Sequence, residues 1–331
     1  MEREKILFLG KNFIRMLLLL FTVSIVTFGL VSMSPIDPLQ ANVGQAALGT
    51  MSEEQKAKLE SYWGVDEPAV RRYLNWAKDF VKGDMGQSLL YRQPVSEVVG
   101  VKLSNSLMLL FIAWIVSGIL GFILGILSGA FRDSWLDRLI KGYSLLIAST
   151  PVFWLALLLL LIFAVWLHLL PVGLSVPIGM EAAGVTVVDR IRHAILPALT
   201  LSITGISNIT LHTREKVIDV MESDYMLFAK ARGEGKWSMI RRHGLRNLIL
   251  PALTLQFASV SEIIGGSVLV EQVFSYPGLG QAAVTAGTGS DVPLLLGITV
   301  VTAAIVFLGN FIANVLYEVV DPRMRKGGTL S

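Results

Sequence analysis

Six apolar stretches, each close to the length needed to cross a lipid bilayer, constrain this chain more than any other feature. A helix needs about 20 apolar residues to cross a hydrocarbon core of roughly 30 Å. Of the 331 residues, 53% are hydrophobic and 16% are charged, whereas soluble proteins carry about 25% charged residues. We therefore predict an all-α integral membrane protein rather than a water-soluble enzyme. Hydropathy and helix breakers place six transmembrane helices at Met16–Met33, Leu107–Phe131, Tyr143–Leu167, Ala194–Leu211, Leu248–Val270 and Leu294–Tyr317.

The first apolar stretch follows basic residues, as the apolar region of a cleaved signal peptide does. Such a region is usually about 7–15 residues long and precedes an A-x-A cleavage site. This stretch is longer, and no A-x-A follows it. A retained transmembrane helix is the favoured prediction, and cleavage is the alternative.

The distribution of basic residues predicts the orientation. Most of the 28 Lys and Arg residues lie in the N-terminal segment, in segments 132–141 and 214–246, and in the tail after residue 322. Basic residues next to spans are retained in the cytoplasm. Both termini are therefore predicted to be cytoplasmic. The net charge of +3 is small and follows this membrane topology, so nucleic acid is not expected as a partner.

The predicted spans divide the chain into four parts. Residues 1–33 form the cytoplasmic N-terminus and first span, 34–106 an extracytoplasmic helical subdomain, 107–317 a core of five spans, and 318–331 a cytoplasmic tail. Ser52, followed by acidic residues, predicts a helix start in the external subdomain. The aromatic residues of this part either pack its core or lie at the membrane interface: Tyr62, Trp63, Tyr73 and Trp76.

Motifs for catalysis or metal binding are missing from the sequence. The four histidines form no H-E-x-x-H pattern, there is no G-x-S-x-G, and the chain has no cysteine. Gly235-Lys236 is not part of a P-loop, because Trp237 follows where Ser or Thr is required. We predict no catalytic residue, metal ion or cofactor in this chain. An intramembrane hydrolase, with Ser and His on different helices, stays open as an alternative.

A polar segment between the fourth and fifth predicted spans cannot cross a membrane. Over 214–247, Ser223 or Asp224 can cap a short helix, and Gly233 can end it in the left-handed conformation. A second helix is expected over Lys236–Leu248. The first helix carries an apolar face and small residues that would let another protein approach closely, whereas a helix lying on lipid is the alternative. These residues are Tyr225, Leu227, Phe228 and Ala231 for the face, and Ala229, Ala231 and Gly233 for close approach.

Several motifs together make the sequence recognisable between about Lys11 and Arg325. The motifs are Asp224-Tyr225, Phe228-Ala229-Lys230-Ala231-Arg232-Gly233, Arg241-Arg242-His243, Leu245-Arg246-Asn247, Leu250-Pro251, Ser149-Thr150-Pro151-Val152-Phe153-Trp154, Leu170-Pro171-Val172-Gly173, the run His193–Leu199, the run Glu271–Gly280, and Asp321-Pro322-Arg323. With these motifs, the polar segment and the spans around it resemble the permease subunits of ABC importers, in the dipeptide, oligopeptide and nickel branch.

The resemblance implies a six-span permease that works with other proteins. Expected partners are a second homologous permease, two ABC ATPase subunits that hold ATP and Mg, an extracytoplasmic substrate-binding protein and the lipid bilayer. On the family pattern, a cytoplasmic coupling helix around Ala229, Ala231 and Gly233, with Asp224, Tyr225 and Phe228, docks into an ATPase subunit. Leu227-Phe228-Ala229 stands where the wider superfamily has Glu-Ala-Ala, so a salt bridge through that Glu is not expected.

Polar residues inside two predicted spans indicate a translocation path, since such groups are costly in a membrane. Glu262 lies near the middle of the fifth span, with Ser259 and Gly266 at helical spacing, and a second polar stripe follows the fourth span at Thr200, Thr204, Asn208 and His212. Packing between helices is the alternative role of Glu262.

A carboxylate at the position of Glu262 favours cationic substrates or a transient contact with a metal, so peptides and nickel chelates both stay open. A secondary transporter of a small cationic solute is a further alternative, although no inverted repeat is apparent.

Small residues recur in the second predicted span. Gly121, Gly125 and Gly129 are four residues apart, which predicts a close contact with another helix. Pro151, Pro197 and Pro251 are expected near the starts of spans, where a missing N–H costs little.

Overall fold

The computed structural model describes residues 2–33, 51–55, 68–174 and 186–320, and these parts are helical with connecting turns. The prediction of an all-α protein is confirmed over them, since their one strand-like pairing is an isolated bridge between Gln87 and Pro94. The helices are α1 (Glu2–Ser32), α5 (Ala69–Val81), α6 (Val95–Ala130), α7 (Trp135–Ala148), α8 (Val152–Leu159), η1 (Leu160–Trp166), α9 (Val187–Met221), α10 (Asp224–Ala231), α11 (Lys236–Met239), η3 (Ile240–Gly244), α12 (Leu245–Ala258), α13 (Val260–Val273), α14 (Leu279–Thr288) and α15 (Val292–Val320).

Four continuous helices are long and apolar enough to span a membrane, within Gly10–Leu30, Val95–Ala130, Val187–Met221 and Val292–Leu316. Two further candidates are pairs of helices joined at a bend, so the described residues hold between four and six candidate spans. α6 begins at Val95, well before the predicted start at Leu107. The apolar pattern located these helices but not their ends, because polar turns at helix ends extend beyond the apolar part.

The predicted span over Tyr143–Leu167 is not one straight helix. α7 ends at Ala148, and the chain turns by 105° before α8 begins at Val152. Pro151 explains the break, because a residue before proline is disfavoured in the helical conformation and Thr150 is that residue. The hydroxyls of Ser149 and Thr150 donate hydrogen bonds to carbonyl oxygens of the last turn of α7.

The predicted fifth span also starts earlier and bends. The backbone is helical from Lys236 through η3 to Ala258, and it bends by 44° before α13 continues to Val273. The separate helix expected over Lys236–Leu248 therefore runs directly into the apolar segment. Pro251 and Pro197 consequently lie inside α12 and α9 rather than near helix starts, which corrects that expectation.

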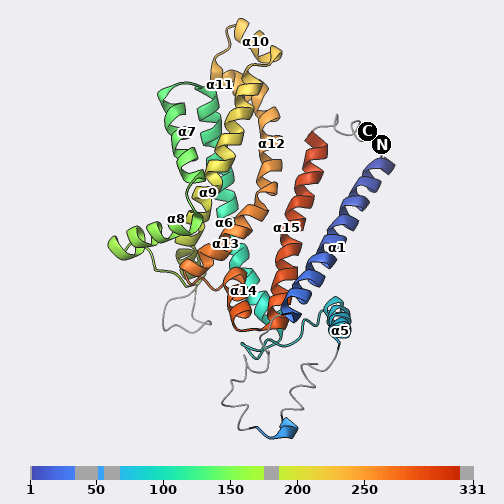
Figure 1. Cartoon of the computed structure of the whole chain (residues 1–331). Coiled ribbons are helices and arrows are strands. Elements are labelled where there is room, and N and C mark those ends of the chain that lie inside the picture. The colour runs from blue at the N-terminus through green and yellow to red at the C-terminus, as the bar shows by residue number, and fades with distance from the viewer. Residues whose placement is uncertain (1, 34–50, 56–67, 175–185, 321–331) are drawn as a thin grey trace. The chain divides into compact units, whose positions relative to one another are not determined.

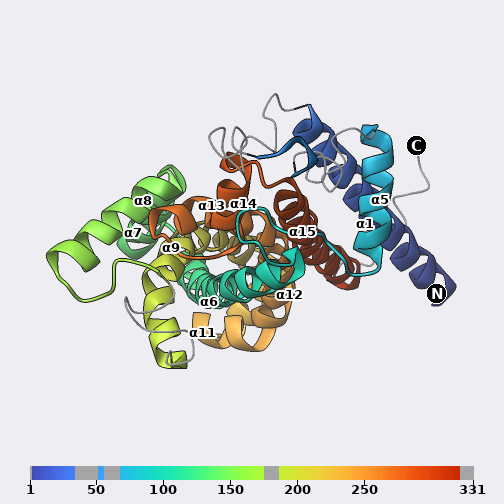
Figure 2. The same cartoon turned by 90° about the horizontal axis from the view of Figure 1, so that it is seen from below.

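One compact unit comprises residues 1–106 and 277–305. In this unit, α5 (cyan in Figure 2) packs beside α1 (dark blue). Tyr73 is 9% exposed, its hydroxyl lies 2.8 Å from Ser24 Oγ, and its ring contacts Phe28. Tyr73 therefore packs against α1, the first predicted span, rather than within a core formed by residues 34–106 alone, whereas Tyr62 and Trp63 lie outside the described residues. The predicted helix start at Ser52 is confirmed, because Ser52 Oγ accepts a 3.3 Å hydrogen bond from the Gln55 backbone N–H.

The second unit comprises residues 107–276 and 306–331, and α9 is its central element. α9 contacts α7, α8, α10, α12 and α13 (Figure 1). Its buried apolar side chains fall into two clusters, one around Leu196 and Leu201 and the other around Val217 and Val220. Helices from several parts of the chain are therefore held through this one helix.

The glycines of α6 form the close helix contact that their spacing predicts. A Cβ added at Gly125 would lie 2.5 Å from Thr213 Cβ, and one added at Gly129 would lie 2.6 Å from Val217 Cβ. Gly121 faces Ile209 in the same way. α6 and α9 approach so closely that a side chain larger than hydrogen does not fit between them.

Candidate functional site

The polar segment after α9 folds into the short helix that the sequence predicts. α10 covers Asp224–Ala231, and Ser223 has the extended backbone of an N-cap residue, although its hydroxyl bonds to Val220 O rather than to the helix. Gly233 follows the helix with φ +83°, so the predicted left-handed stop is confirmed. Asp224 is exposed in the first turn.

The two faces of α10 differ in their burial. Met226 and Ala229 are buried in the cluster of apolar side chains at this end of α9 and α12. Phe228 is 66% exposed and Tyr225 is 44% exposed, and Ala231 lies on the surface as well. The expectation that Ala229 offers a close approach to another protein is therefore corrected: its small side chain is needed where α10 meets its own chain. The face available to a partner is Tyr225, Leu227, Phe228 and Ala231.

Contacts with neighbouring helices fix the position of α10. Asn247 Nδ2 donates a 2.8 Å hydrogen bond to the Tyr225 hydroxyl, and the Met226 side chain lies over Gly244. Lys236 Nζ bonds to the carbonyl oxygen of Ala130 at the end of α6. The short helix is thus held by the segment that leads into α12.

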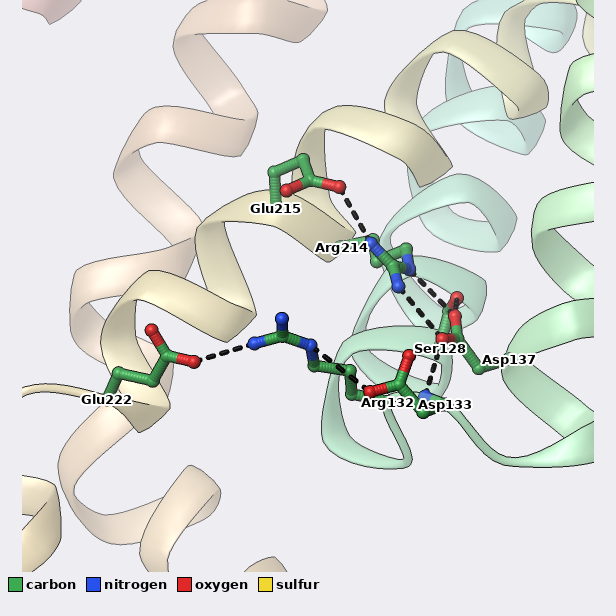
Figure 3. A network of polar contacts seen from close by, with 7 residues as sticks. All are labelled: Ser128, Arg132, Asp133, Asp137, Arg214, Glu215 and Glu222. Atoms are coloured by element: carbon green, nitrogen blue, oxygen red, sulfur yellow. Dashed lines mark hydrogen bonds and ion pairs between the residues drawn. The ribbon is translucent and has the colours of Figure 1, made fainter.

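A buried ion pair lies just before α10 (Figure 3). Arg214 of α9 contacts both carboxylate oxygens of Asp137 of α7, with Nε at 2.7 Å from Oδ1 and Nη2 at 2.8 Å from Oδ2. Their side chains are 8% and 3% exposed. Ser128 Oγ of α6 and the Asp133 backbone N–H donate to the same carboxylate. Three helices therefore meet at one desolvated charge pair, and additional hydrogen bonds offset part of its desolvation.

An outer ion pair follows on the same side of α9. Arg132 Nη1 lies 2.6 Å from Glu222 Oε1, and both side chains are at least half exposed. Glu222 is two residues before α10. The buried pair therefore links α7 to α9, and the exposed pair links the turn before α7 to the residue that follows α9. Neither pair was predicted from the sequence, in which Arg132 and Arg214 count only as charges expected on the cytoplasmic side.

The two polar stripes predicted for the translocation path meet in the structure. Asn208 Nδ2 of α9 donates a 2.9 Å hydrogen bond to Glu262 Oε2 of α13. Glu262 is exposed in this chain, although it belongs to an apolar part of the sequence. Its carboxylate is therefore available to whatever borders this face.

The other residues of the stripes are placed differently. Ser259 is the residue at the bend between α12 and α13, is 7% exposed, and donates to Gln256 O. A Cβ at Gly266 would meet Leu201 in ordinary contact. Thr204 is half-buried, whereas His212 is exposed. The straight-helix spacing overstated how many of these residues share one face, because Ser259 lies buried at the bend whereas Glu262 is exposed.

Three recognisable motifs also come together. The carbonyl oxygen of Gly173 accepts a hydrogen bond of 2.6 Å from His193 Nδ1, and the backbone N–H of Leu174 donates one of 3.0 Å to the carbonyl oxygen of Phe274. A Cβ at Gly173 would clash with the Phe274 carbonyl oxygen. The segment at Gly173 and Leu174 therefore contacts both His193 and the backbone of Phe274, so residues from the three motifs pack against one another.

Among the residues that the structure describes, no group of three or more His, Asp or Glu side chains is arranged to hold a metal ion.

Comparisons with known proteins agree with one another. Residues 121–326 match the family described as the binding-protein-dependent transport system inner membrane component. The oligopeptide transport system permease AppB of Bacillus subtilis is 33% identical over 309 residues, which are 92% of this chain and 95% of that protein. A putative peptide transport system permease of Brucella abortus is 32% identical over 92% of this chain and 94% of its own length. The probable D,D-dipeptide transport system permease DdpB of Escherichia coli is 30% identical, with 92% and 94% covered.

Proposed function

Because this chain belongs to the family of inner membrane components of binding-protein-dependent transport systems, we propose that it is the subunit through which short peptides cross the membrane. As a member of that family, it is a multi-pass inner membrane permease and is not itself an enzyme. This replaces the hypotheses of a secondary transporter and of an intramembrane hydrolase. Peptides are proposed as substrate because the relatives described above are named for oligopeptides, peptides and dipeptides, whereas none of those three is named for nickel.

The proposed complex contains further subunits. A second homologous permease would complete the path, two ABC ATPase subunits would bind ATP and Mg, and an extracytoplasmic binding protein would deliver the peptide. The exposed carboxylate of Glu262 favours a second permease, since an ionised group facing lipid costs about 2.5–3.5 kcal/mol or more. A polar subunit face or an aqueous path would remove that cost.

Coupling to the ATPases is assigned to α10. The observation that carries this assignment is its pattern of burial: Met226 and Ala229 attach the helix to its own chain, while Tyr225 and Phe228 remain exposed. An amphipathic helix that exposes aromatic side chains outside the membrane is suited to a groove on another protein. The two ion pairs beside it, Arg214–Asp137 and Arg132–Glu222, would pass its displacement to α6 and α7.

The proposed topology has six spans with both termini in the cytoplasm. The bent pairs α7–α8 and α12–α13 supply the third and fifth spans, and the segment 34–106 forms the extracytoplasmic insert. The positive-inside distribution of Lys and Arg supports this orientation, because it puts α10 on the same side as the ATPases.

The substrate path is proposed to run along the face where Asn208 meets Glu262. A carboxylate there would attract the α-ammonium group of a peptide. Thr204 and His212 lie one turn to either side of Asn208 on α9, and Ser259 and Gly266 border Glu262 in sequence.

Affinity purification of the tagged chain in mild detergent tests the proposal. Recovery of a second permease and of P-loop ATPases, followed by ATP-dependent uptake of labelled dipeptides into proteoliposomes supplied with the binding protein, is the expected result. Recovery of the chain alone, under conditions that keep a known importer assembled, would contradict it. Uptake of nickel chelates without uptake of peptides would contradict the substrate only.

A further inference from the structure

A cavity of about 350 Å³ lies between α9, α12 and α15 within the second unit. Small-molecule sites usually enclose about 300–1,000 Å³, so the cavity is large enough for part of a peptide. Its wall includes His212, Thr213 and Lys216 of α9, Ala252 of α12 and Asn314 of α15. Neither Asn208 nor Glu262 lines this cavity, so the cavity is distinct from the contact between those two residues.

The side chains that line this cavity include a basic residue and no acidic one. Lys216 lines it, and no Asp or Glu does. No ion pair joins Lys216 to any residue in the described part of the chain. A lysine in a partly enclosed site without a carboxylate beside it attracts an anion.

One buried polar group of the cavity wall, the hydroxyl of Thr213, lacks a hydrogen-bond partner among the described residues. Thr213 is 4% exposed, and its Oγ1 has no hydrogen-bond partner among the described residues. Buried hydroxyl groups are nearly always paired, so an unpaired one at a cavity wall points to a group that enters the cavity. The imidazole of His212 and the amide of Asn314 add N–H donors to the same wall.

The spacing along α9 relates this cavity to Glu262. Asn208, which holds Glu262, His212 and Lys216 follow one another at intervals of four residues and therefore share one face of the helix. At 1.5 Å per residue, Lys216 is about 12 Å along the axis from Asn208. An extended peptide covers about 3.3–3.6 Å per residue, so three or four residues span this distance.

We propose that the cavity is a carboxylate subsite, in which Lys216, with His212 and Thr213, receives the C-terminal carboxylate of a short peptide whose α-ammonium group lies toward Glu262. The proposal rests on the proposed function, because it takes a peptide to be the substrate. A zwitterionic peptide presents one charge of each sign at its two ends, which matches the base Lys216 on this face of α9 and the acid Glu262 of α13 that Asn208 contacts.

Because the chain contains no cysteine, a single cysteine can be introduced into the cavity wall and its rate of chemical modification measured. Ala252→Cys places a single thiol in the cavity wall of this subunit, and its modification can be followed by mass in the purified transporter complex in detergent. Negatively and positively charged methanethiosulfonate reagents report the local potential. Lys216 should favour the negative reagent, and Lys216→Gln should lower the ratio of the two rates by about fivefold. Lys216→Arg should keep the ratio, and Lys141→Gln, which removes an exposed charge from α7, should leave it unchanged.

Protection identifies the occupant. Millimolar trialanine should slow the modification of Cys at position 252, whereas trialanine amide, which lacks the carboxylate, should not. An anionic lipid headgroup offers the same chemistry, so the measurement is repeated with purely zwitterionic and with anionic lipid added. Protection by anionic lipid with none by trialanine would overturn the peptide assignment.

Equal protection by acid and amide, or an unchanged reagent ratio in Lys216→Gln, would also overturn the carboxylate subsite. In either case ATP-dependent uptake of peptides by the unmodified transporter would leave the proposed function standing. Absence of peptide uptake by the unmodified transporter would instead remove the proposed function itself.

Discussion

Asn208 holds the carboxylate of Glu262 through a hydrogen bond of 2.9 Å, although the two residues are 54 positions apart in the chain. The bond joins the middle of α9 to the first turn of α13, directly after the bend at Ser259. It holds an exposed carboxyl group at the start of α13. This arrangement favours a role in the path over packing, because a purely structural acid would be buried and fully paired.

Glu262→Gln should lower the uptake of cationic and zwitterionic peptides by about tenfold, since one charge-assisted contact of about 1.4 kcal/mol or more is lost. Gln keeps an oxygen that accepts from Asn208, so folding should be unchanged. Uptake is measured in proteoliposomes, with Asp219→Asn, which neutralises an exposed acid on α9, as the matched control. Unchanged uptake of every substrate would support the packing role.

Removing one partner of the buried pair should destabilise the protein strongly. Arg214→Ala leaves the Asp137 carboxylate buried without its guanidinium, and such losses typically cost about 3–5 kcal/mol. Thermal unfolding in detergent should show the loss as a lower Tm. Arg132→Ala, which breaks the exposed pair with Glu222, should cost about 1 kcal/mol or less. Equal effects of the two variants would mean that burial does not control the strength of these pairs.

Gly125→Ala should disturb the contact between α6 and α9, because its Cβ would lie 2.5 Å from Thr213 Cβ and 2.9 Å from the Thr210 carbonyl oxygen. Overpacking of this kind usually costs about 1–3 kcal/mol. The control is Gly142→Ala in α7, where an added Cβ meets nothing within 4 Å. That variant should be neutral or slightly stabilising, since Ala is the better helix former. Thermal unfolding of both variants decides the matter.

Gly233→Val should uncouple ATP hydrolysis from transport while leaving membrane insertion intact. The expected effect comes from backbone conformation rather than from a steric clash, because φ at Gly233 is +83° and no atom lies within 4 Å of an added Cβ. A side chain in this conformation costs about 1–2 kcal/mol and shifts the end of α10. Gly235→Val is the control, since Gly235 has φ −72°. The ratio of peptide uptake to ATPase activity is measured, and an unchanged ratio in Gly233→Val would contradict the assignment of α10.

Phe228→Ala should weaken the attachment of the ATPase subunits, because truncation of a buried aromatic anchor at an interface commonly costs about 2 kcal/mol or more. The amount of ATPase that co-purifies with the tagged chain is the measurement. Trp135→Ala serves for comparison, since Trp135 is an exposed aromatic residue in the first turn of α7 rather than in α10. Similar losses in both variants would mean that exposed aromatic area in general, rather than α10, holds the ATPases.

Much of the helical order could be predicted from local signals. Four of the apolar stretches, the stop at Gly233 and the glycine spacing of α6 depend on residues close together in the chain, and each of these is confirmed. The 105° turn before Pro151 and the bend at Ser259 were missed, because hydropathy averages over a helix break. The pairing of Arg214 with Asp137 was missed for a different reason: 77 residues separate them, and both lie among other charges.

The burial of Ala229 shows the same limit within the candidate site. Its small size suggested an approach by another protein, yet the same property suits contact with α9 and the segment after α10. Composition alone does not separate these two uses. The pattern of exposure along α10 does, and it leaves the aromatic side chains for the partner.

The uninterrupted course of α9 has a mechanical consequence. Its 35 residues measure roughly 50 Å at 1.5 Å per residue, and α10 follows its last turn almost at once. If α10 couples to an ATPase as proposed, a displacement of α10 along this axis would be transmitted by α9 to both Asn208 in the middle and His193 near the far end. The pair α7–α8 would not transmit a displacement in this way, because the chain turns by 105° between the two helices.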